Sequence, residues 1–202
     1  MKALLLLSGG FDSPVAAHLI QQQNVEVIAI HFSYEPFTDD APEQKSRKLA
    51  KKLGIKKLYI IKGGEAFAEI ARQTNPRFYY ILAKRFMLKY ASEYADQEQC
   101  QWLITGDNLA QVASQTLTNL TVIDQAATKE VLRPVLCYDK NEIIDLAREI
   151  GTYEASEGPE VCDCLGPKNP ATSSSLDKIQ EEEAKLSFST LKQKVTTQEV
   201  IL

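Results

Sequence analysis

The segment LLLLSGGFDSPVAA, residues 4–17, contains the pattern that decides the fold. Its four leucines are typical of a strand that is buried on both faces of a parallel sheet. Gly9 and Gly10 allow the backbone to turn tightly after the strand. Ser13 followed by Pro14 predicts a helix start with Ser13 as the N-cap, because proline has no N–H to lose in the first turn.

A strand that turns directly into a helix presents backbone N–H groups and the positive end of the helix dipole to one space. The residues Ser8–Ser13 therefore predict a phosphate-binding loop, although a simple strand-to-helix turn is the alternative interpretation. Asp12 would repel a phosphate by itself, so we expect it to hold Mg²⁺ or to orient the loop. The loop matches neither the Walker A pattern nor the GxGxxG pattern.

The rest of the chain alternates apolar strands with amphipathic helices, which predicts an α/β fold. We expect a doubly wound, open parallel sheet of about five strands with helices on both faces, and ligands bind such sheets at the carboxyl ends of the strands. Residues 1–185 are predicted to form the domain, 157–175 a long loop and 186–202 a C-terminal tail. The predicted strands are 2–7, 25–32, 57–61, 102–105 and 131–136, and the predicted helices are 14–23, 40–53, 65–72, 79–94, 109–116, 139–150 and 177–187.

Composition excludes several classes of protein. Lys and Arg number 23 against 27 Asp and Glu, a formal net charge of −4, which argues against nucleic-acid binding by bulk charge alone but leaves room for a local basic patch. Four scattered cysteines do not make a secreted disulfide framework. No signal peptide or membrane span is visible, so we expect a cytoplasmic protein without a membrane partner.

Five blocks of sequence occur in an order that resembles a known family. They are SGGFDSPVAA, IHF, ITGDNLAQVASQTLTNL, VLRPVLCYDKNEII and IGTYEASEGPEVC, which begin at residues 8, 30, 104, 131 and 150. The first is similar to the PP-loop of the ATP pyrophosphatases, and the set resembles the catalytic domain of the tRNA uracil 4-sulfurtransferase (ThiI) family. The resemblance implies the adenine nucleotide alpha hydrolase-like fold, with ATP and Mg²⁺ as cofactors. Asp107-Asn108 stands where that family usually has Glu-Ser.

The resemblance also implies which residues contact ATP. Lys84 and its neighbour Arg85 would neutralise phosphate charge, although a solvated helix face is the alternative. His31 would lie at the adenine edge, or else be a packed strand-end histidine. The implied ATP contacts are Leu6, Leu7, Ser8, Gly9, Gly10, Asp12, Ser13, His31, Phe32, Lys84, Gly106 and Gln115.

The cysteines bear on the chemistry. Cys162 lies in a PEVC segment where the family has a cysteine that takes part in sulfur transfer, so Cys162 and Asp12 are the predicted catalytic residues. Cys164 is open to three interpretations: a resolving thiol, a metal ligand or neither. Cys137 and Cys100 are predicted to be buried core thiols. No zinc-ligand spacing is present, and a three-cysteine cluster would have to recruit Cys137.

The implied function is ATP-dependent tRNA sulfur transfer. Uracil O4 would be adenylated with release of pyrophosphate, and a persulfide would then convert it to 4-thiouridine. The implied partners are tRNA presented by a separate THUMP-type protein, a persulfide donor such as a cysteine desulfurase or a rhodanese-type protein, and a second copy of the chain in a homodimer. The alternatives are a PP-loop enzyme that thiolates or amidates a small molecule or a sulfur-carrier protein, as in thiamine biosynthesis, or a catalytically silent nucleotide sensor.

Overall fold

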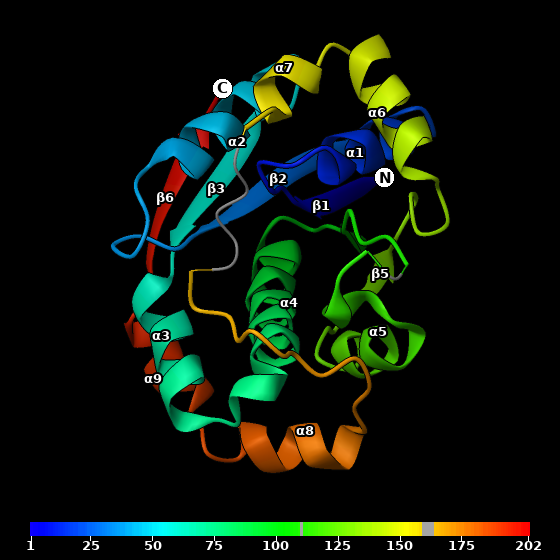
Figure 1. Cartoon of the computed structure of the whole chain (residues 1–202). Helices are drawn as coiled ribbons and strands as arrows, with labels where there is room; N and C mark the ends of the chain where they lie inside the picture. Colours follow the sequence, from blue (N-terminus) through cyan, green and yellow to red (C-terminus); the bar gives the residue numbers. More distant parts are fainter. Residues whose placement is uncertain (110, 159–163) are drawn as a thin grey trace.

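The computed structural model (Figure 1) describes residues 1–109, 111–158 and 164–202. Its centre is a six-stranded sheet with the strand order β5-β4-β1-β2-β3-β6. The first five strands run parallel, whereas β6 pairs antiparallel with β3 at one edge. The strands span Lys2–Leu6 (β1), Glu26–Ser33 (β2), Lys57–Lys62 (β3), Trp102–Ile104 (β4), Glu130–Leu132 (β5) and Thr196–Ile201 (β6).

Helices cover both faces of the sheet, which confirms the predicted doubly wound α/β class (Figure 1). One face carries α1 (Asp12–Gln21), α2 (Ala41–Lys52), α6 (Lys140–Glu149) and α7 (Tyr153–Ser156). The other carries α3 (Gly64–Gln73), α4 (Tyr79–Gln97), α5 (Leu117–Asp124), α8 (Leu176–Glu183) and α9 (Phe188–Gln193). Two short 3-10 helices, η1 (Pro76–Phe78) and η2 (Ala113–Gln115), lie in the connections. Within the described residues, no helix is both long enough and apolar enough to cross a membrane.

The leucines of β1 serve two separate cores, because successive side chains of a strand point to opposite faces. Leu5 and Leu7 pack into the cluster under α1 and α2, and Leu4 packs into the larger, aromatic cluster under α4. Leu4 and Leu5 are both fully buried, and complete burial of a leucine contributes about 1.5–3 kcal/mol. The strand thus holds the loop that follows it in a fixed position between the two helical layers.

The structure corrects two predictions near the centre of the chain. The strand predicted over 131–136 ends at Leu132, and a turn follows in which the N–H of Leu136 bonds to the carbonyl of Arg133. The helix predicted over 109–116 is wrong. Thr116 is instead the N-cap of α5, because its hydroxyl accepts a hydrogen bond from the N–H of Asn119.

Residues 186–202, predicted to be a tail, contain α9 and β6. β6 pairs with β3 along its whole length, from Thr196 opposite Lys62 to Ile201 opposite Lys57. Five of its six side chains are exposed, so β6 has no apolar pattern that sequence analysis could detect. The helix predicted over 139–150, by contrast, is confirmed as α6, which starts with a capping box at Asp139.

Candidate active site

The carboxyl ends of β1, β2 and β4 meet at one edge of the sheet, where the PP-loop Ser8–Ser13 connects β1 to α1. Ser13 closes this loop: its hydroxyl accepts a hydrogen bond from the N–H of Ser8 at 2.9 Å and lies 3.0 Å from the Ser8 hydroxyl. The Ser8 hydroxyl accepts a hydrogen bond from the N–H of Gly10 at 3.3 Å. The two serines therefore fix the shape of the loop through their side chains.

The predicted start of the first helix needs correction. α1 begins at Asp12 rather than Pro14, and its N-cap, Phe11, makes no side-chain cap bond. Ser13 is thus not the cap, because its hydroxyl is committed to the loop. Neither Gly9 nor Gly10 has a positive φ, so the tight turn does not depend on left-handed backbone.

Gly106 is the contact between the end of β4 and the PP-loop. A Cβ at this position would lie 2.5 Å from the backbone nitrogen of Ser13 and 2.7 Å from the carbonyl carbon of Asp12. Any side chain at residue 106 would push the two segments apart. Glycine is therefore needed here for the close approach of protein backbone to protein backbone, and the implied contact of Gly106 with ATP stays a prediction.

Asp12 has a partner that sequence analysis missed. Lys140, the first residue of α6, places its Nζ 3.1 Å from the Asp12 carboxylate and 5.8 Å from the ring centroid of Phe11. Ser156 of α7 donates a hydrogen bond to the carbonyl of Gly10 at 3.2 Å. The helix start predicted at residue 139 places the lysine directly after the cap. What the sequence did not show was that α6 packs against α1.

His31 lies on β2 beside the start of the loop. Its Nδ1 is 2.9 Å from the carbonyl oxygen of Leu7, so the proton is assigned to Nδ1. Burial lowers the pKa of His31, which keeps the ring neutral at pH 7 and leaves Nε2 as an acceptor. That Nε2 is buried and has no hydrogen-bond partner among the described residues. Leu7 and Phe32 are buried on opposite faces of the sheet, and Leu6 is half-buried.

A second group forms around the carboxylate of Asp107, just beyond β4. Lys84 of α4 pairs with one carboxylate oxygen, and Arg133 donates to the other at 3.1 Å. Thr105 donates to the same carboxylate at 2.8 Å, and Gln115 does so at 3.4 Å. We call these five residues the Asp107 cluster. Sequence analysis identified only Lys84 and Gln115 as site residues, since nothing in the sequence linked them to the other three.

The charge of the Asp107 cluster is fixed. Burial would raise the pKa of Asp107, but Lys84 and Arg133 outweigh it and hold that pKa well below its usual range. The carboxylate is therefore ionised at any physiological pH. Gln115 turns its amide nitrogen toward the carboxylate, and its Oε1 is buried without a partner in the described part of the chain. The predicted ATP contacts His31 and Gln115 thus each carry an unpaired buried acceptor.

Not every predicted residue reaches this edge. Arg85 is buried against Glu183 and the carbonyl of Val122, so it is not available to neutralise phosphate. Cys137 is exposed, not core, because β5 ends early. Cys162 lies outside the described residues.

The remaining cysteines are also placed. Cys164 is exposed. Cys100 is buried as predicted, and burial raises the pKa of its thiol to about 11. Among the residues that the structure describes, no group of three or more His, Cys, Asp or Glu side chains could hold a metal ion.

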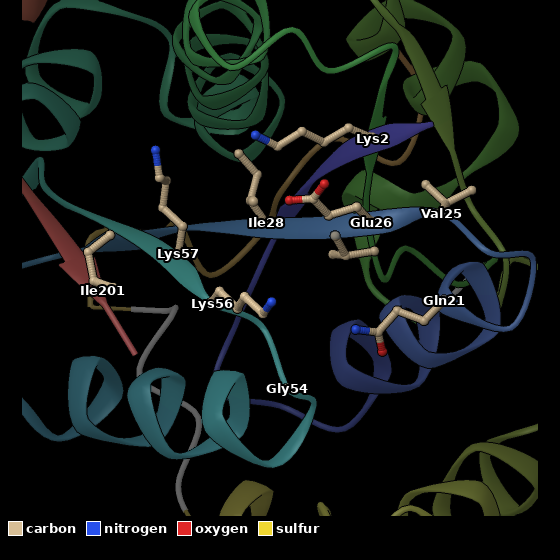
Figure 2. Close-up of a pocket in the computed structure, with 10 residues that line it drawn as sticks. Lys2, Gln21, Val25, Glu26, Ile28, Gly54, Lys56, Lys57 and Ile201 are labelled. Carbon is tan, nitrogen blue, oxygen red and sulfur yellow. The ribbon is translucent and has the colours of Figure 1, made fainter.

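The cavity in Figure 2 lies at the other end of the sheet. It has a volume of about 310 Å³, and Lys2, Glu26 and Lys57, from the amino ends of β1, β2 and β3, line it (Figure 2). Because nucleotide sites of doubly wound sheets lie at the carboxyl ends, this cavity is not the predicted ATP site.

Comparisons with known proteins agree with the geometry. The chain is 42% identical over 196 residues to a probable tRNA sulfurtransferase of Alkaliphilus oremlandii (strain OhILAs), covering 94% of this chain and 50% of that protein. It resembles the crystal structure of a 4-thiouridine synthetase–RNA complex with bound ATP at 32% identity and a TM-score of 0.91, covering 98% of this chain and 55% of that one.

A more distant structure shares only the fold. NMN synthetase from Francisella tularensis is 18% identical, with a TM-score of 0.61, over 94% of this chain and 74% of its own.

The chain spans about half the length of the curated relatives it matches. The family model described as "Thiamine biosynthesis protein (ThiI)" matches residues 1–188. With a PP-loop at the end of β1 and this match over nearly its whole length, the chain belongs to the ThiI family.

Proposed function

We propose that this chain is an ATP-dependent tRNA sulfurtransferase module that converts uridine to 4-thiouridine. One observation carries the proposal. At the carboxyl ends of the parallel strands, the PP-loop, closed by its two serines, lies near two buried acceptors that have no partner among the described residues, those of His31 and Gln115. Buried polar groups normally have partners. A purine nucleotide, with an exocyclic amine and ribose hydroxyls to donate, would supply them.

The phosphates of ATP would lie over the PP-loop. The N–H groups at the start of α1 and the positive end of its dipole favour an anion there. Asp12 fits a Mg²⁺ ion that is held mainly by ATP phosphates, since Mg²⁺ in such sites takes only one or two protein carboxylates. When bound, the ion would neutralise phosphate charge. Lys140 holds the Asp12 carboxylate in place, and Lys84 would contact the nucleotide from α4.

The proposed reaction has two halves. Uracil O4 attacks the α-phosphorus of ATP, and pyrophosphate leaves. The terminal sulfur of a persulfide, on Cys162 in this proposal, then attacks C4 and expels AMP. A second thiol must next cleave the remaining sulfur–sulfur bond, which leaves 4-thiouridine and a disulfide that a thiol reductant restores. Cys164 and a thiol of the sulfur donor are the candidates for this second thiol.

The partners remain part of the proposal. We expect tRNA as the acceptor, a separate THUMP-type protein to present it, and a cysteine desulfurase or rhodanese-type protein to supply persulfide. A homodimer is a further expectation, which sedimentation would test. Adding a purified THUMP protein should lower the Kd for tRNA; an unchanged Kd would argue against such a partner.

The test is to incubate the chain with labelled ATP, tRNA and a persulfide donor. The expected products are AMP, pyrophosphate and 4-thiouridine; formation of ADP and phosphate would contradict the proposal. Cys162→Ser should abolish 4-thiouridine formation yet leave ATP binding unchanged, with Cys100→Ser as the matched control. Full thiolation by Cys162→Ser would remove this cysteine from the mechanism.

The family model's description favours one second candidate, an acceptor used in thiamine biosynthesis. The same assay distinguishes the two. Pyrophosphate release that depends on a sulfur-carrier protein, and not on tRNA, would favour this second acceptor.

A further inference from the structure

Helix α2 is the most basic element that follows the PP-loop. Its sequence, APEQKSRKLAKK, contains five basic residues and one acid. The side chains that face the sheet are Glu43, Ser46, Leu49 and Ala50. Because residues three, four and seven apart share one face of a helix, the lysines at 45, 48, 51 and 52 lie along one side of α2, where Lys45 is half-buried and the other three are exposed.

No acidic side chain of the described residues neutralises these four lysines. Arg47, on the flank of the helix, pairs with Glu43. Among the described residues, none of the four lysines forms an ion pair, and Lys48, Lys51 and Lys52 are exposed. Lys45 and Lys52 donate only to backbone carbonyls, those of Ser156 and Gly151. We call Lys45, Lys48, Lys51 and Lys52 the lysine face of α2.

The lysine face begins at the rim of the candidate active site. The Cδ of Lys45 lies 3.4 Å from the position that a Cβ would take on Gly9 of the PP-loop. Its Nζ lies 3.4 Å from the carbonyl oxygen of Ser156, whose hydroxyl bonds to Gly10. From there the face extends along α2, which lies beside α7 at the outside of the molecule (Figure 1).

The length of the lysine face indicates what it would bind. From residue 45 to residue 52 of α2, the helix rises about 10 Å at 1.5 Å per residue, which is more than one phosphate group needs. Four like charges along this length, in a chain whose net charge is −4, are a local basic patch suited to the regularly spaced charges of a nucleic-acid backbone. Glu154 and Glu157 are exposed acids on and after α7, which packs against α2, and Asp39 and Asp40 are exposed acids just before α2. In the described chain, none of these four acids pairs with the lysines.

We propose that the lysine face of α2 is a docking surface for the phosphate backbone of the RNA whose base enters the site beside the PP-loop. This inference rests on the proposed function, because it takes the acceptor to be RNA. Each lysine would replace a counterion on one phosphate, so binding should weaken as salt rises. The contacts would position the strand without reading its sequence.

The test reverses two charges that lie away from the PP-loop. The variant Lys48→Glu with Lys51→Glu is compared with Lys56→Glu with Lys178→Glu, whose lysines are also exposed and form no ion pair within the described ranges. Both double variants have the same net charge. Fluorescence anisotropy with labelled tRNA, over a range of salt concentrations, gives the Kd and its salt dependence. Thermal unfolding checks that each variant is folded, and Lys48→Gln with Lys51→Gln is the milder replacement if the first variant is not.

We expect the α2 variant to raise the Kd for tRNA about tenfold or more at low salt. The slope of log Kd against log salt should fall by about 1–2, since each lost phosphate contact removes roughly 0.7–0.9. The control should bind tRNA like the unmodified chain. Equal effects of the two variants on the Kd for tRNA, or no effect of either, would overturn the inference. So would the absence of tRNA binding by the unmodified chain, which is the result expected if the lysine face binds an acidic protein instead.

The outcome also separates the inference from the proposed function. Affinity for ATP should be unchanged in both variants. If the α2 variant loses tRNA binding but the unmodified chain releases no pyrophosphate, the docking surface stands and the proposed reaction fails. If the α2 variant binds and thiolates tRNA normally, the reaction stands and the docking surface is wrong.

Discussion

Two ionic clusters lie at opposite ends of the same sheet. At the carboxyl ends, Asp107 is bound by Lys84, Arg133, Thr105 and Gln115. At the amino ends, Glu98 accepts hydrogen bonds from Lys2 and Lys57, each at 2.8 Å, and from the Tyr59 hydroxyl at 2.5 Å. Each cluster joins a carboxylate to two cations and a hydroxyl.

The clusters differ in what they leave unsatisfied. Glu98 ties the end of α4 to β1 and β3, and each of its two oxygens has a partner. The Asp107 cluster includes the unpaired Oε1 of Gln115 and adjoins Gly106, which touches the PP-loop. The number of ion pairs therefore does not by itself distinguish a site from a structural joint. We propose that a buried acceptor without a partner does, and the variants described next test this difference.

Asp107→Asn should have the largest effect. It removes the charge that compensates Lys84 and Arg133, the latter with only 8% of its side chain exposed. Breaking a buried ion pair typically costs about 3–5 kcal/mol of unfolding free energy. Chemical denaturation would measure this loss, and ATP titration would show a weaker affinity. The matched control is Asp124→Asn, which removes the more exposed partner of Arg133; equal losses in the two variants would contradict a special role for Asp107.

Lys84→Ala should separate binding from stability. Asp107 keeps Arg133 and Thr105 as partners, so the fold should tolerate the change. A hydrogen bond to a charged group is worth about 1.5–3 kcal/mol, and the Kd for ATP should therefore rise about 10–100-fold. Calorimetric titration would measure this Kd. Lys89→Ala changes a lysine of the same helix that pairs with Glu183, and it should leave ATP binding intact. An unchanged Kd for Lys84→Ala would remove this residue from the nucleotide site.

Glu98→Gln should affect stability alone. Burial would raise the pKa of Glu98, but the bonds from Lys2, Lys57 and Tyr59 outweigh it and lower the pKa from 4.5 to about 2. This group therefore stabilises the fold above pH 4.5, and its contribution is lost as the pH falls toward 2. The variant should lose about 1–2 kcal/mol at pH 7.

Two further measurements extend the Glu98→Gln test: the pH dependence of its unfolding free energy, and a control variant of the neighbouring carboxylate Glu199. Between pH 4.5 and 2, Glu98→Gln should lose less unfolding free energy than the unmodified chain. Glu199→Gln is the control, because that carboxylate is 47% exposed and 3.5 Å from Lys57, and exposed pairs contribute little. A lower ATP affinity in Glu98→Gln would contradict the interpretation that the Glu98 cluster is structural only.

The sequence predicted the elements that carry strong local signals. The strand of β1 and the helices predicted over 40–53 and 139–150 lie within a few residues of the features that cause them. Leucines mark β1, a capping box at Asp139 starts α6, and Gly54, whose φ is +66°, follows α2. The two clusters could not be predicted in this way. Lys84 meets Asp107 across 23 residues, and Lys2 meets Glu98 across 96. Such contacts depend on how the strands are ordered, which no local pattern records.

The same reasoning explains the other errors. β6 is an exposed edge strand, so burial left no alternation in its sequence. Arg85 and Lys84 are adjacent on α4, yet one is buried against Glu183 and the other reaches Asp107. Only the direction of each side chain, set by helix packing, separates a structural arginine from a candidate nucleotide contact.

Gln115→Leu should have the smallest effect on the unfolding free energy, and it should stabilise the fold rather than destabilise it if it changes stability at all. The Gln115 amide gives up only a long bond of 3.4 Å to Asp107, and the variant removes a buried acceptor that has no partner within the described chain. Unfolding free energy without nucleotide should therefore stay within about 1 kcal/mol or increase, since an unpaired buried polar group is itself costly. The Kd for ATP should rise about 3–10-fold, the value of one neutral hydrogen bond.

Asn119→Leu provides the contrast for that last variant. Asn119 is also a buried amide, but its nitrogen donates to the carbonyls of Ala113 and Ala171, and its oxygen accepts from Ser174. Its loss should cost about 1–3 kcal/mol. If Gln115→Leu is as destabilising as Asn119→Leu and leaves ATP affinity unchanged, then the unpaired oxygen of Gln115 does not mark a nucleotide contact. If instead Asn119→Leu loses stability but keeps ATP affinity, while Gln115→Leu keeps stability but loses ATP affinity, the unpaired acceptor of Gln115 is a nucleotide contact.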